Sequence, residues 1–182
     1  YIPYLIALHT GMRLGEILAL FWEDIDFEEN RIYINKTLIV QNKKQLKLST
    51  PKTQSSNRNI LITGQLRDEL LKWKDIQSKI LQNTNYSCSE KKFVCTDEKG
   101  QPMNPKCVSA YNSSLAKRLN LNFKIHDFRH THATILLESG VNAKIVQERL
   151  GHSNITTTLG TYGHVTKFGE EDAILKFQQH IK

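Results

Sequence analysis

Two histidines, an arginine and a tyrosine stand between positions 126 and 162, and together these residue types can act on a phosphodiester. They are His126, Arg129, His152 and Tyr162, and a second arginine, Arg13, lies far upstream. Arginine offers paired N–H donors to phosphate oxygens, histidine donates or moves a proton near neutral pH, and a phenol can serve as a nucleophile. The set predicts attack by a tyrosine on a phosphodiester held by its oxygens, without a metal ion.

Arg13 follows a predicted helix stop at Thr10-Gly11 and opens the next helix. A helix N-terminus favours anions, because its backbone N–H groups are unpaired and its dipole is positive there. Glu16 stands three residues later on the same face and could orient the guanidinium group. The alternative is an ordinary exposed ion pair between Arg13 and Glu16.

His126 and Arg129 are three residues apart at the start of a predicted helix, so they share a face. This pair suits a phosphate, although a polar first turn capped by Asp127 would explain it equally well. His126, His130 and His132 could instead suggest a metal site. That alternative is weak, because Arg129 sits among them and no cysteine lies at ligand spacing. We expect His132 to pack against a neighbouring element.

His152 follows Leu150-Gly151, where the glycine allows a sharp turn that would place the histidine at the rim of a loop. By itself this pattern is an ordinary helix end. Tyr162 by itself would be a half-buried core residue, since it is one of six tyrosines. Both residues gain a chemical role only in combination with the arginines.

The composition indicates a folded, basic chain. Its 182 residues carry 25 Lys+Arg against 18 Asp+Glu, a formal net charge of +7, and the pI is about 9.3. An apolar fraction of 39% predicts a packed core, and the positive charge favours a polyanionic partner. Cys88, Cys95 and Cys107 match no metal spacing and predict reduced thiols in a cytosolic protein. We expect no membrane span, because no run of 18 apolar residues occurs.

Hydrophobic spacing predicts a mainly α-helical chain with one small three-stranded antiparallel sheet, an α+β fold. Near-alternating apolar residues place the strands at about 32–38, 46–48 and 60–62. Asn, Pro and Gly mark several helix ends. The helices are expected at about 2–10, 14–21, 65–82, 104–119, 127–139, 142–150, 156–162 and 168–180.

Three further expectations concern the arrangement of the chain. The helix over 65–82 should turn one apolar side to the core, comprising Leu66, Leu70, Trp73, Ile76 and Ile80. Residues 22–30 should form a polar turn. Residues 1–9 look like the middle of an apolar helix, so we expect the chain to be a fragment that lacks an N-terminal part.

Taken in order, the motifs resemble the catalytic domain of the tyrosine recombinases, the phage integrase family. The matching text is Thr10-Gly-Met-Arg-Leu-Gly-Glu-Ile-Leu with Trp22-Glu-Asp-Ile-Asp, Pro51-Lys-Thr with Ser56 and Arg58, His126-Asp-Phe-Arg-His-Thr, Leu150-Gly-His-Ser, and Thr161-Tyr-Gly-His. The resemblance runs from Tyr1 to about Val165 and looks closest to integrases of Gram-positive phages and conjugative transposons. It departs mildly at Phe128 and His132, neither of which is a catalytic position. It implies that residues 1–182 form a tyrosine recombinase catalytic domain without the family's N-terminal DNA-binding domains.

The resemblance implies DNA strand cleavage and rejoining. Tyr162 would attack the scissile phosphate, form a covalent 3′-phosphotyrosine and release a 5′-hydroxyl. Arg13 and Arg129 would hold the non-bridging oxygens, and His152 would add a third donor. Because the bond energy stays in the phosphotyrosine, no ATP, metal or other cofactor is expected.

Proton transfer is implied for two further residues. Lys52 resembles the general acid that protonates the leaving 5′ oxygen, although it could equally be a solvated loop lysine. Its rivals by sequence alone are Lys43, Lys44 and Lys47. His126 would act as a base or phosphate donor, and Glu16 would support Arg13.

The implied function is site-specific recombination that integrates or excises a phage or other mobile element. The expected partners are double-stranded DNA, further copies forming a homotetramer around a Holliday junction, and possible accessory directionality factors. Without DNA the chain could be a monomer. The C-terminal tail, 168–182, looks like the helix that docks on a neighbouring protomer in this family, although it could instead fold back on its own protomer or stay loose. The protein would act in the bacterial cytoplasm, at the nucleoid.

Other basic residues are candidates for contacts with the DNA backbone, although solubility alone could explain each of them. They are Lys36, Lys43, Lys44, Lys47, Arg58, Lys117 and Arg118. Two other classes stay open: a type IB topoisomerase, which shares the tyrosine chemistry, and a DNA-binding protein without chemistry. Residues 142–162 loosely resemble a helix-turn-helix, but a repressor would not explain Arg13, Lys52 and Arg129 in family order.

Overall fold

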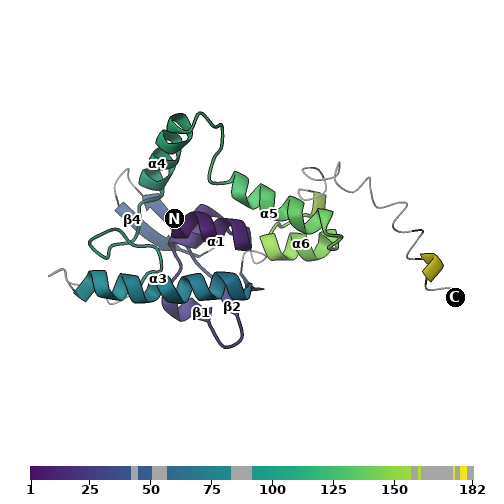
Figure 1. Cartoon of the computed structure of the whole chain (residues 1–182), viewed down its shortest axis with the longest axis horizontal. Coiled ribbons are helices and arrows are strands. Elements are labelled where there is room, and N and C mark those ends of the chain that lie inside the picture. Colours follow the sequence, from purple (N-terminus) through teal and green to yellow (C-terminus); the bar gives the residue numbers. More distant parts are fainter. Residues whose placement is uncertain are drawn as a thin grey trace.

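A computed structural model of the chain describes residues 1–41, 45–50, 57–82, 92–156, 160, 174 and 177–179. Helices dominate these ranges, together with two small antiparallel sheets (Figure 1). In chain order the elements are α1 (Ile2–Thr10), α2 (Leu14–Leu18), the 3-10 helix η1 (Trp22–Asp24), β1 (Ile25–Asp26), β2 (Arg31–Ile34), β3 (Thr37–Gln41), β4 (Gln45–Ser49), β5 (Arg58–Leu61), α3 (Gly64–Gln82), α4 (Pro105–Arg118), α5 (Asp127–Glu138) and α6 (Ala143–Leu150). The predicted fold class is confirmed, while the helices predicted over 156–162 and 168–180 lie largely outside the described residues. The helix predicted over 14–21 ends at Leu18, because Leu20 and Phe21 pair with Val94 and Phe93. None of the described helices combines the length and the apolar character that crossing a membrane requires.

The strands form two sheets, where the sequence predicts one. β1, β2 and β5 pair in the antiparallel order β1-β2-β5, and β3 and β4 form a separate hairpin. The strand predicted over 32–38 is therefore two strands, interrupted at Asn35 and Lys36. Lys36 leaves the sheet there to bind the Asp24 carboxylate at 2.5 Å. The segment 22–30, predicted as a polar turn, forms a turn only over 27–30, and its first five residues form η1 and β1.

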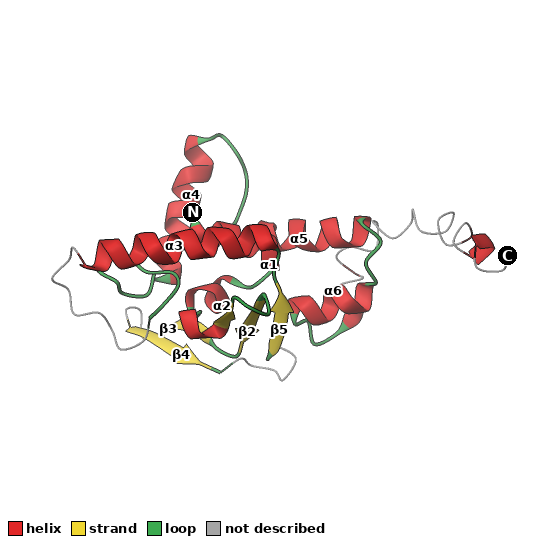
Figure 2. Ribbon diagram, turned by 60° about the horizontal axis from the view of Figure 1, so that its bottom comes forward, coloured by secondary structure: helices red, strands yellow, loops and turns green. Residues whose placement is uncertain are grey.

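The core has two parts. The larger one lies among α1, α2, α3 and the sheet of β1, β2 and β5, and its fully buried members include Ile6, Ile17, Leu18, Ile32, Leu66 and Leu70. The smaller one joins α5 to α6 through Ala133, Val146 and Leu150. Figure 2 shows α3 running along one side of the strands, with α5 and α6 beside each other. α5 meets the larger part mainly through α1.

Gly11 lies where the two parts of the core meet. Its φ of 67° is in the left-handed region, which favours glycine. A Cβ atom at this position would lie 2.6 Å from Leu150 Cδ2 and 2.8 Å from His132 Cδ2. The turn after α1 therefore needs glycine both for its backbone conformation and for the close approach of α5 and α6.

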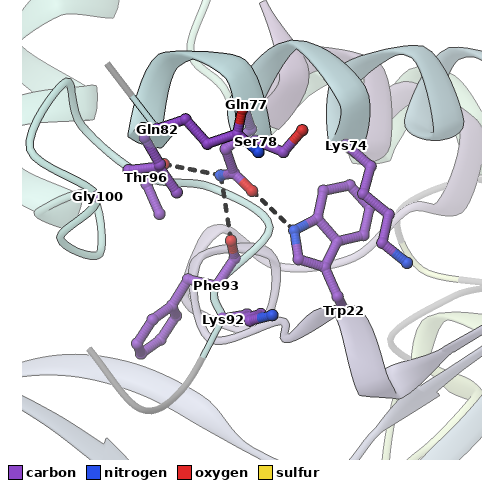
Figure 3. Close-up of a pocket in the computed structure, with 10 residues that line it drawn as sticks. Trp22, Lys74, Gln77, Ser78, Gln82, Lys92, Phe93, Thr96 and Gly100 are labelled. Carbon is purple, nitrogen blue, oxygen red and sulfur yellow. Dashed lines mark hydrogen bonds between the residues drawn. The ribbon is translucent and has the colours of Figure 1, made fainter. Parts of the chain in front are cut away.

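The buried side of α3 differs from the predicted one. Leu66, Leu70 and Gln77 are buried, whereas Ile76 is 49% exposed and Ile80 is 41% exposed. Positions 66, 70, 73 and 77 are three or four residues apart, so their side chains lie on one face of the helix. This face packs on the core, and residue 77 is therefore buried. Gln77 is stabilised there because its amide nitrogen donates to Thr96 Oγ1 at 2.8 Å and its oxygen accepts from the Trp22 indole at 2.7 Å (Figure 3).

The predicted caps are present. Asn104 accepts a hydrogen bond from the Lys106 N–H at 2.9 Å at the start of α4, and Asn142 accepts from the Lys144 N–H at 2.8 Å at the start of α6. Gly140 and Gly151 adopt positive φ angles of 78° and 68° after α5 and α6. These ends follow the rule that Asn begins helices and left-handed Gly ends them.

Candidate active site

Arg13 is held at the start of α2 by a buried carboxylate. Its backbone N–H donates to Glu16 Oε2 at 2.9 Å, and its guanidinium donates to Glu16 Oε1 at 3.0 Å. Arg58, at the start of β5, donates to the same two oxygens at 3.2 and 3.0 Å. Glu16 is 4% exposed, so the alternative of an ordinary exposed ion pair does not fit. The contact with Arg13 is the one that the i, i+3 spacing predicts.

Glu16 stays ionised in this setting. Burial alone would raise the pKa of its carboxyl, but the hydrogen bond and charge of Arg58, followed by those of Arg13, outweigh burial and lower the pKa. One carboxylate thus faces two guanidinium groups, and the local charge remains positive. Such a cluster is suited to an additional anion.

Arg129 comes from the first turn of α5 and is 2% exposed. Its two terminal nitrogens donate to the carbonyl of Gly11 at 2.5 Å and to that of Leu150 at 2.9 Å. Arg13 donates to the carbonyl of Gly151, the next residue, at 3.0 Å. The two arginines predicted to bind phosphate therefore converge on the end of α6.

His152 follows this helix end directly. Its pKa is lowered to about 4, first by burial and then by neighbouring positive groups, which are Arg129, Arg13, Arg58 and His126. Arg129, Arg13 and Arg58 donate hydrogen bonds to the three carbonyls that directly precede His152, so these residues form one cluster. At neutral pH the His152 imidazole is uncharged and can donate one hydrogen bond.

His126 immediately precedes α5, and its ring lies 4.9 Å from the ring of His130. Burial lowers the pKa of His126, and the charges of His130, Arg129 and Arg13 lower it further, while Asp127 opposes them. A bound phosphate would raise the pKa of a histidine beside it, because a negative charge favours the protonated form. The site could thus change its protonation when substrate enters.

His132 packs against neighbouring elements, as expected. Its Nδ1 lies 2.8 Å from the carbonyl of Leu8 in α1, and its Nε2 accepts a hydrogen bond from Arg149 at 3.0 Å. Both ring nitrogens are therefore engaged, which contradicts the metal alternative for the three histidines. Over the described residues, no group of three His, Cys, Asp or Glu side chains could hold a metal ion.

Two predicted site residues, Lys52 and Tyr162, lie outside the described residues, as do the candidates Lys43 and Lys44. Their roles remain predictions. The described members of the predicted set gather around the end of α6, on segments that are far apart in sequence. They are Arg13, Glu16, His126, Arg129 and His152.

The other basic candidates fall into two groups. Lys47 on β4, together with Lys117 and Arg118 at the end of α4, is exposed and could contact a DNA backbone. Arg58 is 7% exposed and bound to Glu16, so its geometry favours a structural role. Lys36 is likewise paired with a buried carboxylate, that of Asp24.

Arg149 is a residue that the sequence analysis does not single out. Its guanidinium donates to His132, to the carbonyl of Leu61 at 2.9 Å and to the carbonyl of His9 at 3.2 Å. These partners come from three elements, so no local spacing signals the contact. The one available hint is its place directly before the Leu150-Gly151-His152 motif.

The arrangement of elements is similar to that of solved recombinases. The Tn1549 transposon integrase, in a complex with circular intermediate DNA, matches with a TM-score of 0.80 and 27% identity over 97% of this chain and 59% of that chain. The XerA recombinase shares the fold, with a TM-score of 0.67 and 19% identity over 99% of this chain and 57% of that chain. The fold is therefore that of tyrosine recombinase catalytic domains.

The chain belongs to the phage integrase family, whose model matches residues 2–168. The integrase of Staphylococcus phage L54a is 36% identical over 176 residues, which cover 94% of this chain and 49% of that protein. The ICEBs1 integrase of Bacillus subtilis is 32% identical over 163 residues, which cover 89% of this chain and 44% of that protein. The family predicted from the motifs is confirmed, and the chain spans about half the length of these curated relatives.

Proposed function

We propose that this chain is the catalytic part of a site-specific DNA recombinase, which cleaves and rejoins DNA through a covalent 3′-phosphotyrosine to integrate or excise a mobile element. The observation that carries the proposal is the convergence of Arg13 and Arg129 on the end of α6, directly before His152. Membership of the phage integrase family supports it. The Tn1549 relative, which was solved with DNA, supports DNA as the substrate.

The arginines would stabilise charge on the scissile phosphate. Phosphoryl transfer depends mostly on positioning and on charge stabilisation at the non-bridging oxygens. Arg13 has a 39% exposed side chain and can reach an incoming phosphate, while Glu16 fixes its direction. Arg129 is buried, so its charge acts through a medium that screens less than water does. Loss of one such preorganised donor typically costs about 3–4 kcal/mol of transition-state stabilisation.

The chemical step would be an in-line displacement. The phenolic oxygen of Tyr162 forms a bond to phosphorus as the bond to the 5′ oxygen breaks, and Lys52 protonates that leaving oxygen. His126 takes up the phenolic proton or donates to the phosphate, and the uncharged His152 donates a hydrogen bond to a non-bridging oxygen. Attack by another 5′-hydroxyl then reverses the step, without ATP or a metal.

Assembly and location follow from the same proposal. Four copies would act on two duplexes through a Holliday junction, and residues 168–182 would dock on a neighbouring copy. The protein would work in the cytoplasm on nucleoid DNA, where an accessory factor could set the direction of recombination. The alternative activity is a type IB topoisomerase, which would relax supercoils without exchanging strands between duplexes.

Trapping of the covalent intermediate tests the proposal. The chain is incubated with supercoiled plasmid and with nicked duplexes, quenched with SDS, and examined for a protein–DNA adduct. We expect an adduct with the wild type and none with Tyr162→Phe, because that change removes only the nucleophilic oxygen and should leave DNA binding intact. Tyr111→Phe, at a residue that is 60% exposed on α4, is the matched control and should form the adduct normally.

The opposite results would have clear meanings. An adduct formed by Tyr162→Phe would refute the assigned nucleophile. Failure of the wild type to form an adduct on all of these DNAs would count against cleavage by this chain. Relaxed plasmid without any joined duplexes would favour the topoisomerase alternative.

A further inference from the structure

Three consecutive carbonyl groups at the end of α6 each accept a hydrogen bond from a different arginine. The pairs are Arg58 Nε to the carbonyl of Arg149 at 2.7 Å, Arg129 to that of Leu150 at 2.9 Å, and Arg13 to that of Gly151 at 3.0 Å. The last carbonyls of a helix have no partner within the helix and carry partial negative charge, which favours cations there. This helix end therefore contributes one contact to the positioning of each of three guanidinium groups, beside the contacts from Glu16 and from the carbonyl of Gly11.

The side chain of Arg149 fixes the same helix end to the rest of the molecule. Its Nε donates to His132 on α5, and its two terminal nitrogens donate to the carbonyl of Leu61 at the end of β5 and to that of His9 in α1. A planar guanidinium presents its donors in fixed directions, which the single ammonium group of lysine cannot reproduce. Arg149 thus joins α6 to three elements at once.

The protonation state of His132 suits its hydrogen bond with Arg149. A carbonyl can only accept, so the Nδ1 facing Leu8 must carry the proton, and Nε2 is left to accept from Arg149. The pKa of His132 is lowered to about 4, first by burial and then by the charge of Arg149. The imidazole is therefore neutral near pH 7, and the acceptor that Arg149 requires is present.

We infer that Arg149 is a positioning residue of the proposed active site, because it holds the helix end on which the two phosphate-binding arginines converge. This inference rests on the proposed function. Arg149 acts through the backbone of α6 and touches no reacting atom in the proposed mechanism. A merely structural Arg149 would change the stability of the fold but leave the surroundings of His152 unaltered in the folded protein.

The pKa of the His152 imidazole, followed by NMR, separates these roles without any DNA. In Arg149→Lys the helix end should move away from the arginines and admit water, so the pKa of His152 should rise from about 4 by about one unit or more. Arg67→Lys is the matched control, because Arg67 lies on α3 and pairs with Asp68 at the surface. It should leave the His152 titration unchanged.

Circular dichroism would confirm that each variant is folded. A folded Arg149→Lys protein with an unchanged His152 pKa would overturn the inference. If Arg149→Lys does not fold, His132→Phe removes the acceptor while keeping an aromatic ring, and the same rise is expected. An unchanged titration in that folded variant would overturn the inference equally.

A second measurement connects the contact to the chemistry. The rate of adduct formation at saturating DNA should fall roughly 10²-fold in Arg149→Lys, since small misplacements of catalytic groups cost about that much, while DNA affinity stays within about twofold. An unchanged rate would also overturn the inference. If the wild type forms no adduct, the proposed function fails, and the NMR titration still decides whether Arg149 positions the cluster.

Discussion

Glu16 holds the guanidinium groups of Arg13, which precedes α2, and of Arg58, at the start of β5. It is buried and binds both guanidinium groups. Glu16→Gln should lower the free energy of unfolding at pH 7 by about 3 kcal/mol, because removal of one partner from a buried ion pair leaves the other charges uncompensated. Urea denaturation of the two proteins measures the difference. A loss below about 0.5 kcal/mol would contradict the structural role.

The same variant tests the pH dependence of stability. The pKa of Glu16 is lowered in the folded state, so its contribution is fully present above the unfolded pKa of about 4.3 and is lost as pH falls through the folded pKa. The gap in stability between wild type and Glu16→Gln should therefore narrow in acid. Denaturation curves at neutral pH and near pH 3 provide the comparison. An equal difference in stability at both pH values would contradict the lowered pKa of Glu16.

Gly11 offers a test of close packing at one residue. Gly11→Ala should cost about 3 kcal/mol or more, because the positive φ is strained for alanine and the new methyl group would meet Leu150 and His132. Gly140→Ala is the matched control, since Gly140 also has a positive φ but has no atom within 4 Å of its added Cβ. It should cost about 1 kcal/mol. Equal thermal shifts in the two variants would show that packing at Gly11 contributes nothing.

At the scale of elements, α3 is attached to the segment after it by a buried amide. The side chain of Gln77 bonds to Trp22, to Thr96 and to the carbonyls of Phe93 and Val94. Figure 3 shows this amide between the helix and the facing loop. Polar contacts of this kind fix the register of α3 more strictly than apolar packing would, because each unmatched group carries a desolvation cost.

Gln77→Leu should lower the free energy of unfolding by about 2–3 kcal/mol, since it leaves the indole N–H of Trp22 and the carbonyl of Phe93 without their partner. Ile76→Gln, at the neighbouring exposed position, should change stability by no more than about 0.5 kcal/mol. Chemical denaturation of both variants gives the answer. If Ile76→Gln proved the more damaging change, the apolar side predicted from the sequence would be the true one.

At the scale of the whole molecule, the net charge of +7 predicts that the affinity for DNA depends on the salt concentration. Binding should weaken steeply as salt rises, because each neutralised phosphate releases a counterion. Lys117→Gln, at an exposed position on α4, should reduce the slope of log K against log salt by about one if that residue contacts a phosphate. Lys72→Gln, at a lysine paired with Glu69 on α3, is the control. Fluorescence anisotropy would measure both, and a flat salt response would contradict a backbone-dominated interface.

The sequence by itself determined the family and several helix ends, and it supplied the motifs that predict a candidate site. Arg13 with Glu16, His126 with Arg129, and Leu150-Gly151-His152 are recognisable because each motif is short and its chemistry is local. Asn caps and left-handed glycines are likewise local, so the ends of α4, α5 and α6 could be predicted. Alternation of apolar residues located most of the strand-forming segments.

The tertiary structure alone decided which groups meet. Pairing of β2 with β5, separation of the β3–β4 hairpin and burial of Gln77 depend on contacts between distant segments, which no periodicity encodes. The same holds for Arg58 and Arg149. The sequence marks Arg58 as a motif residue and a candidate for DNA contact and does not mark Arg149, whereas in the fold Arg58 binds a buried carboxylate and Arg149 binds His132 and two carbonyl groups. The physical reason is that a charge gains a fixed partner only after folding removes the water that would otherwise solvate it.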